Sequence, residues 1–100
     1  MINHVVLFKL RDADDAAELV RRLHALRSQI PEIHHLEAGI DVTGSERSFD
    51  VALVSRFGSL DDLNTYRDHP DHLNLVAWIG EVTTNRVAVD YESGEDLPAA

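Results

Sequence analysis

The chain has 100 residues, of which 44% are hydrophobic and 27% are charged, and these values correspond to one globular domain. The net charge of -9 opposes binding to nucleic acid or to an anionic membrane, because phosphate groups repel an acidic surface. No stretch approaches the roughly 20 apolar residues that span a bilayer. The absence of cysteine excludes disulfides and thiolate catalysis. The apolar start of the chain alternates like a strand, and it lacks the basic region and the small-residue cleavage site of a signal peptide. We therefore expect a cytoplasmic protein.

The first half of the chain predicts a strand, a helix and two further strands. Residues Ile2–Leu10 are rich in β-branched and aromatic types and predict the first strand. Asp12 is placed to cap a helix whose apolar residues recur with helical spacing to about Gln29. Alternation then predicts strands over Ile33–Val42 and Phe49–Phe57, with a turn between them. The first and last of these strands are apolar on both faces, so both faces need cover.

A short helix follows in the second half of the chain. Ser59 is placed to cap it, and Leu60, Leu63 and Tyr66 lie on one apolar stripe. This spacing directs Tyr66 toward the interior of the protein.

A second helix and a last strand complete the expected elements. Pro70 suits the first position of the helix, with His69 as its N-cap, and we expect the helix to end at Gly80. Alternation predicts the last strand over Thr83–Tyr91. Residues 93–100 are small and acidic, so we expect a flexible C-terminal tail after a domain that covers residues 1–92.

The order strand, helix, strand, strand, helix, strand predicts an α+β fold, a ferredoxin-like antiparallel sheet with its helices on one face. A monomer with a few exposed valines on the other face is one interpretation. An apolar patch that extends over several strands favours a homodimer in which two sheet faces pack together. The apolar residues expected on that face are Val5, Leu7, Ala52, Val54, Val87 and Val89.

The segment from Tyr66 to His72 brings a phenol and two imidazoles to the joint between two helices. His72 lies in the first turn of its helix, where the helix dipole favours a neutral imidazole. Tyr66 and His72 are therefore candidate catalytic residues, since a phenol and a neutral base can abstract a proton next to a carbonyl or orient a polar ligand. The expected pocket residues are His4, Val6, Phe8, Leu53 and Leu75.

Each histidine also has a structural interpretation. His69 can serve only as a helix N-cap, and His4 can be a hydrogen-bonded core residue. A metal site at His69 and His72 would need a nearby aspartate, and the spacing is not that of a zinc site, so we predict neither a metal nor a cofactor. His34 and His35 point to opposite faces of a strand, which makes them a poor chelating pair.

Four stretches of the chain form a pattern when they are taken in order: Ile2–Leu10, Phe49–Val54 leading to Phe57, the His-Pro-x-His core of Tyr66–His72, and Val89–Tyr91. Together they resemble the stress-responsive dimeric α/β-barrel (Dabb) family over almost the whole chain. The resemblance implies a ferredoxin-like protomer that packs against a second copy as a dimeric α/β barrel. The family includes plant polyketide cyclases related to olivetolic acid cyclase, whose tyrosine and histidine would correspond to Tyr66 and His72, with His4 lining the pocket.

Three functional hypotheses follow. The first is a stress-responsive, homodimeric Dabb-type protein with a cleft for a small apolar ligand and no established catalysis. The second is a cofactor-free cyclase or lyase that acts on a carbonyl (polyketide-like) substrate, with His72 as general base and Tyr66 as donor to the developing oxyanion. The third is a monooxygenase of the antibiotic-biosynthesis or haem-degrading type, which Trp78 and Asn74 permit without favouring.

Overall fold

The computed structural model describes residues 1–94 of the chain. None of the helices in this part is long and apolar enough to cross a membrane. The elements follow the predicted order, with a short 3₁₀ turn at Ala13–Asp15 before the first helix. They are β1 (Ile2–Leu10), α1 (Ala16–Gln29), β2 (His35–Ile40), β3 (Val51–Phe57), α2 (Leu60–Asp68), α3 (Pro70–Val82) and β4 (Thr83–Glu92).

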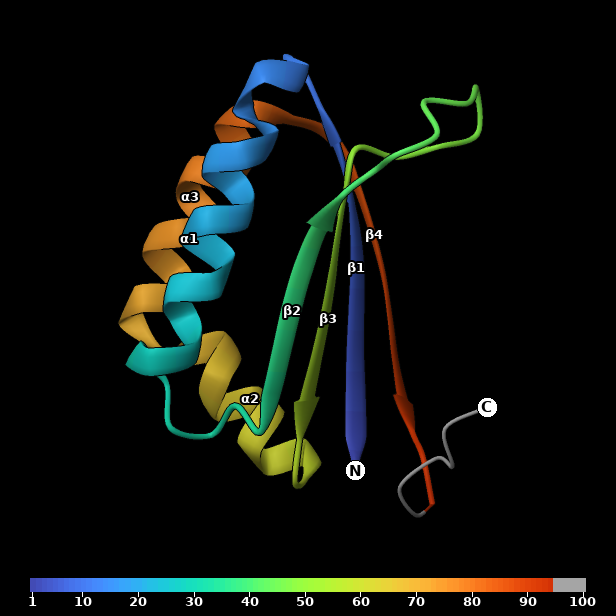
Figure 1. The fold of residues 1–100 in the computed structure, drawn as a ribbon. Helices are drawn as coiled ribbons and strands as arrows, with labels where there is room; N and C mark the ends of the chain where they lie inside the picture. Colours follow the sequence, from blue (N-terminus) through green and yellow to red (C-terminus); the bar gives the residue numbers. More distant parts are fainter. Residues whose placement is uncertain (95–100) are drawn as a thin grey trace.

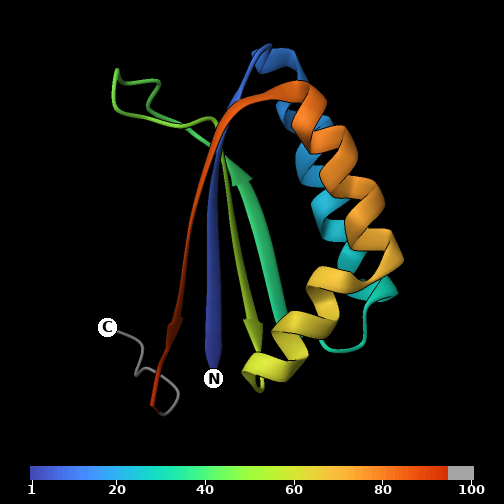
Figure 2. The same cartoon turned by 180° about the vertical axis from the view of Figure 1, so that it is seen from behind.

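The strands form a four-stranded antiparallel sheet in the order β2-β3-β1-β4, with β2 and β4 at its edges. Within residues 1–94 the helices lie on one face of this sheet and the other face carries none, as Figures 1 and 2 show from opposite sides. The predicted ferredoxin-like α+β fold is confirmed. The core lies between the sheet and the helices, and the α1 stripe of Leu19, Leu23 and Leu26 is buried in it.

Side chains cap α2 and α3 as the sequence predicts, whereas Asp12 caps the 3₁₀ turn before α1, and the N-cap of α1 itself, Asp15, makes no side-chain capping bond. The side chain of Asp12 accepts a hydrogen bond from the Asp14 N–H at 2.9 Å, at the 3₁₀ turn that leads into α1. Ser59 Oγ accepts the Asp62 N–H at 3.1 Å at the start of α2. The His69 Nδ1 accepts the Asp71 N–H at 3.1 Å and caps α3. These caps satisfy main-chain donors that have no partner within the helix.

The expectation that Gly80 ends the second helix is wrong, because α3 continues to Val82. The helix ends instead where Thr83 enters the extended conformation, and the Thr83 hydroxyl donates to the main-chain oxygen of Ile79 at 2.7 Å. Glycine weakens a helix by only about 1 kcal/mol, which tertiary packing overrides here. The partly buried Val82 packs against the core and holds this last turn in place.

Two strands are shorter than the alternation predicts. β2 spans His35–Ile40 rather than Ile33–Val42, and β3 begins at Val51 rather than Phe49. Hydrogen bonds between the chain segments continue beyond β2, since the Asp41 N–H donates to the Asp50 oxygen at 2.9 Å. The alternation of apolar residues in the sequence thus continues beyond the two paired strands into the loop that joins them.

Ser93 belongs to the folded domain, although the sequence places it in the tail. Its side chain is buried, the Asn3 amide donates to Ser93 Oγ at 3.0 Å, and the Ser93 N–H donates to the Met1 oxygen at 3.0 Å. The rest of the expected tail, from residue 95 to residue 100, lies outside the described residues.

The sheet face without helices carries the apolar row that the sequence predicts. Val5 pairs with Val54 on one side and with Val89 on the other, and Leu7 pairs with Ala52 and Val87 in the same way. We call this surface the open face. Leu7, Val87, Val89 and Tyr91 are exposed on it.

The sequence also places Leu60 on the inner stripe of α2, and this expectation is wrong, since Leu60 is 57% exposed whereas Leu63 is 0% exposed. Replacing Leu63 by alanine should therefore lower the free energy of unfolding by about 2–5 kcal/mol, because it leaves a cavity in the core. Leu60→Ala in the same helix is the matched control and should change it by about 0.5 kcal/mol or less. Urea denaturation followed by circular dichroism measures both, and equal losses would contradict this core.

Candidate functional site

The predicted site residues surround one cavity of about 220 Å³ between α3 and the sheet. Its walls are mostly apolar side chains. The predicted site and pocket residues that line it are His4, Val6, Phe8, Leu53, Tyr66, His72 and Leu75. Six further lining residues were not predicted as pocket residues: Leu23, Val76, Ile79, Arg86, Val87 and Ala88.

Strand alternation and two helix ends bring the polar groups of this cavity together. His4 lies in the middle of β1 on the face with Val6 and Phe8, so its ring points toward the helices. Tyr66 lies in the last turn of α2, and His72 lies in the first turn of α3. The sharp joint at Pro70 therefore places a phenol and an imidazole on neighbouring turns.

The Tyr66 ring forms the floor of an aromatic cluster and is only 1% exposed. Its centroid lies 4.4 Å from that of His72, 5.0 Å from that of Phe57 and 5.9 Å from that of His4. Burial raises the pKa of Tyr66 to about 12, so the phenol stays protonated at neutral pH. Its hydroxyl makes no hydrogen bond with any residue in the described part of the chain.

His72 is held in one tautomer by the main chain. Its Nδ1 lies 2.9 Å from the carbonyl oxygen of Arg67, and a carbonyl can only accept, so Nδ1 carries the hydrogen. In the neutral ring Nε2 is then an acceptor, and among residues 1–94 it has no hydrogen-bond partner. Burial is the largest cause that lowers the pKa of His72 below 6.5. The hydrogen bond to the Arg67 carbonyl oxygen opposes this shift, and the positive charges of Arg67 and Arg86 add to it. The sequence predicts a neutral imidazole from the helix dipole, whereas burial is the main cause here.

A hydrogen bond to Asp90 that the sequence did not predict fixes the position of the His4 ring. Its Nδ1 lies 2.5 Å from Asp90 Oδ1, and the other oxygen of Asp90 accepts from the Arg67 guanidinium. Burial alone would raise the pKa of Asp90, but the hydrogen bond with His4 and the charge of Arg67 outweigh it and lower the pKa. Asp90 stands opposite His4 in the β1–β4 register, so only strand pairing reveals this contact.

The other histidines have no role in this cavity. His69 serves as the N-cap of α3, which confirms its structural interpretation. His34 and His35 are exposed beside and on the edge strand β2. Among the described residues, no group of three or more histidine, aspartate or glutamate side chains could hold a metal ion.

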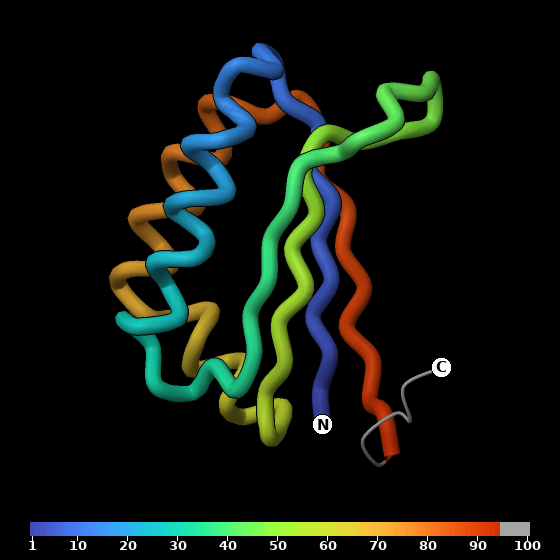
Figure 3. The backbone as a smooth tube through the Cα atoms, viewed as in Figure 1, coloured from blue at the N-terminus to red at the C-terminus, as the bar shows by residue number. Residues whose placement is uncertain are grey.

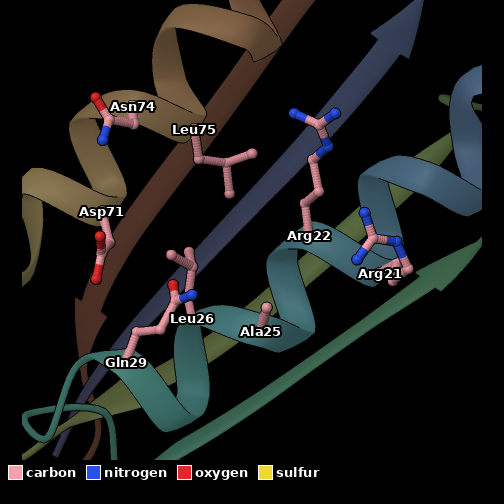
Figure 4. Close-up of a pocket in the computed structure, with 8 residues that line it drawn as sticks. All are labelled: Arg21, Arg22, Ala25, Leu26, Gln29, Asp71, Asn74 and Leu75. Carbon is pink, nitrogen blue, oxygen red and sulfur yellow. The ribbon is translucent and has the colours of Figure 1, made fainter.

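A second groove of about 330 Å³ lies between α1 and α3, on the helical side of the molecule (Figure 4). Arg21 and Arg22 lie along it, but both pair with Glu18, and the Arg22 guanidinium also stacks over the Trp78 ring at 4.1 Å. With its charges already paired, this open groove is the weaker candidate for a binding site.

Two relatives with solved structures resemble this chain closely. A dimeric protein of unknown function with a ferredoxin-like fold from Bacteroides fragilis is 32% identical, with a TM-score of 0.82 over 92% of this chain and 95% of that one. A dimeric ferredoxin-like protein of unknown function from Thermobifida fusca is 31% identical, with a TM-score of 0.79 over 90% of this chain and 88% of that one. An antibiotic biosynthesis monooxygenase, at 13% identity and a TM-score of 0.76, shares the fold alone.

Sequence comparison agrees with these structures. The stress-response A/B barrel domain-containing protein DABB1 of Arabidopsis thaliana is 32% identical over 106 aligned residues, which include 100% of this chain. The chain spans only 50% of the length of that relative. The model of the stress responsive A/B barrel domain matches residues 2–93. The chain therefore belongs to the stress-responsive A/B barrel (Dabb) family.

Proposed function

We propose that this protein binds a small, mostly apolar compound with a carbonyl group in the cavity under Tyr66 and His72. The observation that carries the proposal is the pairing of an unpartnered phenol with an imidazole whose tautomer is fixed, inside an apolar wall. Within residues 1–94 the Tyr66 hydroxyl has no acceptor, so a ligand carbonyl in the cavity can take its hydrogen bond. The carbonyl oxygen of the ligand would accept from Tyr66, while the apolar remainder would contact Phe8 and Leu53.

The size of the cavity limits the ligand. Pockets for drug-sized compounds are typically about 300–1,000 Å³, and this cavity of about 220 Å³ is smaller. A compound with one ring or a short chain fits this volume better than a long alkyl polyketide does.

Acetophenone and α-methylstyrene provide a matched pair of probes, because they share a shape and differ in the carbonyl group. The protein should bind acetophenone more tightly, and Tyr66→Phe should reduce this preference by about 3–10-fold, the value of one neutral hydrogen bond. Chemical-shift titration by NMR measures both dissociation constants. Equal affinities for the two probes in the unmodified protein would contradict the role of the Tyr66 hydroxyl.

Proton abstraction from a bound carbonyl compound is a second candidate function, and the lowered pKa of His72 favours it. Nε2 of His72 would take a proton from the carbon next to the carbonyl, and the Tyr66 hydroxyl would stabilise the developing oxyanion by a hydrogen bond. Return of the proton to carbon completes the cycle without a cofactor. A cyclase or a lyase would use the same first step.

Exchange of the methyl protons of acetophenone in D₂O tests this step. His72→Ala should slow the exchange by about 100-fold or more, whereas the exposed His34→Ala should leave it unchanged. Because burial lowers the pKa of His72, the neutral base persists on acidification, so the rate should be half-maximal below pH 6.5. Proton NMR follows the methyl signal over time. Exchange that survives in the His72 variant would exclude His72 as the base.

We also propose that the protein forms a homodimer through the open face. Two relatives more than 30% identical are dimeric, and the apolar row on this face would otherwise face water. A cytoplasmic location remains a prediction from the sequence.

Sedimentation velocity at micromolar concentration tests the homodimer. The unmodified protein should sediment as a dimer, and Val89→Glu should shift it to a monomer, because two charges would be buried against an apolar partner. Leu73→Glu, on the exposed side of α3, replaces an equally exposed side chain and should leave the dimer intact. A folded monomer in the unmodified protein would contradict the proposal.

A further inference from the structure

The candidate cavity has polar groups at both of its ends. Tyr66 and His72 lie at one end, next to the joint between α2 and α3. Arg86 lines the cavity from β4, which Figure 3 shows in red as the outermost strand at one edge of the sheet. Among the described residues that line the cavity there is no lysine, aspartate or glutamate and no second arginine. The charge of the Arg86 guanidinium is therefore not balanced within the cavity wall.

Strand register separates Arg86 from the other polar groups. Arg86 pairs with Phe8 in β1, whereas Asp90, four residues further along β4, pairs with His4. Four residues of a strand span about 13 Å between Cα atoms, because each residue adds about 3.3 Å. Ala88 lies between Arg86 and Asp90 on the same face of the sheet and lines the cavity as well. The β4 wall is thus cationic near one end and apolar in the middle.

Helix α3 forms the opposite wall of the cavity. Its lining residues recur with helical spacing, and they are His72, Leu75, Val76 and Ile79. They span about 10 Å along the helix axis, at 1.5 Å for each residue. Because α3 passes directly into β4, the Ile79 end of this stripe lies nearer to Arg86 than the His72 end does, and Figure 2 shows the two elements meeting there. A ligand that spans the cavity therefore has apolar walls between two polar ends.

The guanidinium of Arg86 has no partner in the described part of the chain. It makes no hydrogen bond or ion pair within residues 1–94, whereas Arg67 pairs with Asp90. The Arg86 side chain is exposed, so it stands at the rim of the cavity, and its charge is close enough to lower the pKa of His72. The flat fork of a guanidinium fits the two oxygens of a carboxylate. The rim is therefore suited to an anionic group.

The acidity of the whole protein does not exclude an anionic ligand. Salt at about 0.1 M screens exposed charges that are more than about 10 Å apart. The net charge of -9 therefore acts only weakly at the cavity, compared with a charge on its rim.

Arg86 lies on the face of the sheet that the helices cover. Side chains alternate along β4, so Arg86 and Ala88 point toward the helices and Val87 points to the open face. The homodimer proposed above uses the open face, on the other side of the sheet. Binding of a ligand by Arg86 therefore does not depend on the homodimer.

We propose that the ligand is a carbonyl compound with a carboxylate at its other end, and that Arg86 binds this carboxylate. The carbonyl oxygen accepts from the Tyr66 hydroxyl, and the apolar middle of the ligand contacts Val6 and Ala88. The ligand class is then that of small keto acids, with one ring or a short chain between the two groups. The cavity of about 220 Å³ favours the planar carboxylate over the larger phosphate group. This inference rests on the proposed function, because it uses the same cavity and the same hydrogen bond.

Two probes of the same shape test the role of Arg86: 4-acetylbenzoate, an anion at neutral pH, and the neutral 4-acetylbenzamide. Both carry the acetyl group of acetophenone at the opposite end of the ring. The protein should bind the carboxylate about 5–10-fold more tightly, a preference between that of an exposed ion pair and that of a buried hydrogen bond to a charged group. Chemical-shift titration by NMR measures both dissociation constants. Added sodium chloride should reduce the preference.

Three variants assign the preference to one side chain. Arg86→Gln removes the charge, so it should abolish the preference and leave the affinity for 4-acetylbenzamide unchanged. Arg86→Lys keeps the charge without the fork and should retain part of the preference. Arg27→Gln is the matched control, because it removes the same charge from an exposed side chain of α1 that does not line the cavity. It should leave both dissociation constants unchanged.

The outcomes separate this inference from the proposed function. If the protein binds acetophenone and 4-acetylbenzamide but shows no preference for the carboxylate, the inference is wrong while the proposed function stands. A preference that survives in Arg86→Gln also overturns the inference, because another group would then hold the carboxylate. If none of the three probes binds, the proposed function fails together with the inference.

Discussion

The hydrogen bond from His72 Nδ1 to the carbonyl oxygen of Arg67 decides which nitrogen of the imidazole a ligand can meet. It commits Nδ1 as a donor, so Nε2 is left as the acceptor, and burial keeps that acceptor neutral. The bond exists because α2 ends and α3 begins within a few residues, at the joint marked by Pro70. The chemistry of the cavity therefore depends on how two short helices meet.

Arg67 contributes to the same cavity at both of its ends. Its carbonyl oxygen orients His72, and its guanidinium pairs with Asp90, which in turn holds His4. One residue at the end of α2 thus connects the helix joint to the edge strand β4. Tyr66 lies between the two imidazoles and contacts both rings. Rigid support of this kind is what a binding site needs in order to orient a ligand.

Local patterns in the sequence predict the fold and the members of the cavity well. Alternation places His4 on the helix side of β1, and the caps at Ser59 and His69 locate the helix joint. The end of α3 could not be predicted, because packing of Val82 overrides the helix-breaking tendency of Gly80. The contact between His4 and Asp90 joins residues 86 positions apart and depends on strand register, which a single sequence does not specify.

The protonation state of His72 is the central claim, and nitrogen NMR of the imidazole tests it directly. Long-range correlation spectra of the ¹⁵N-labelled protein distinguish a protonated ring nitrogen from an unprotonated one, and a pH titration gives the pKa. We predict a neutral ring with hydrogen on Nδ1, a bare Nε2 and a pKa below 6.5. Hydrogen on Nε2 in the neutral ring, or a pKa above 6.5, would contradict the account.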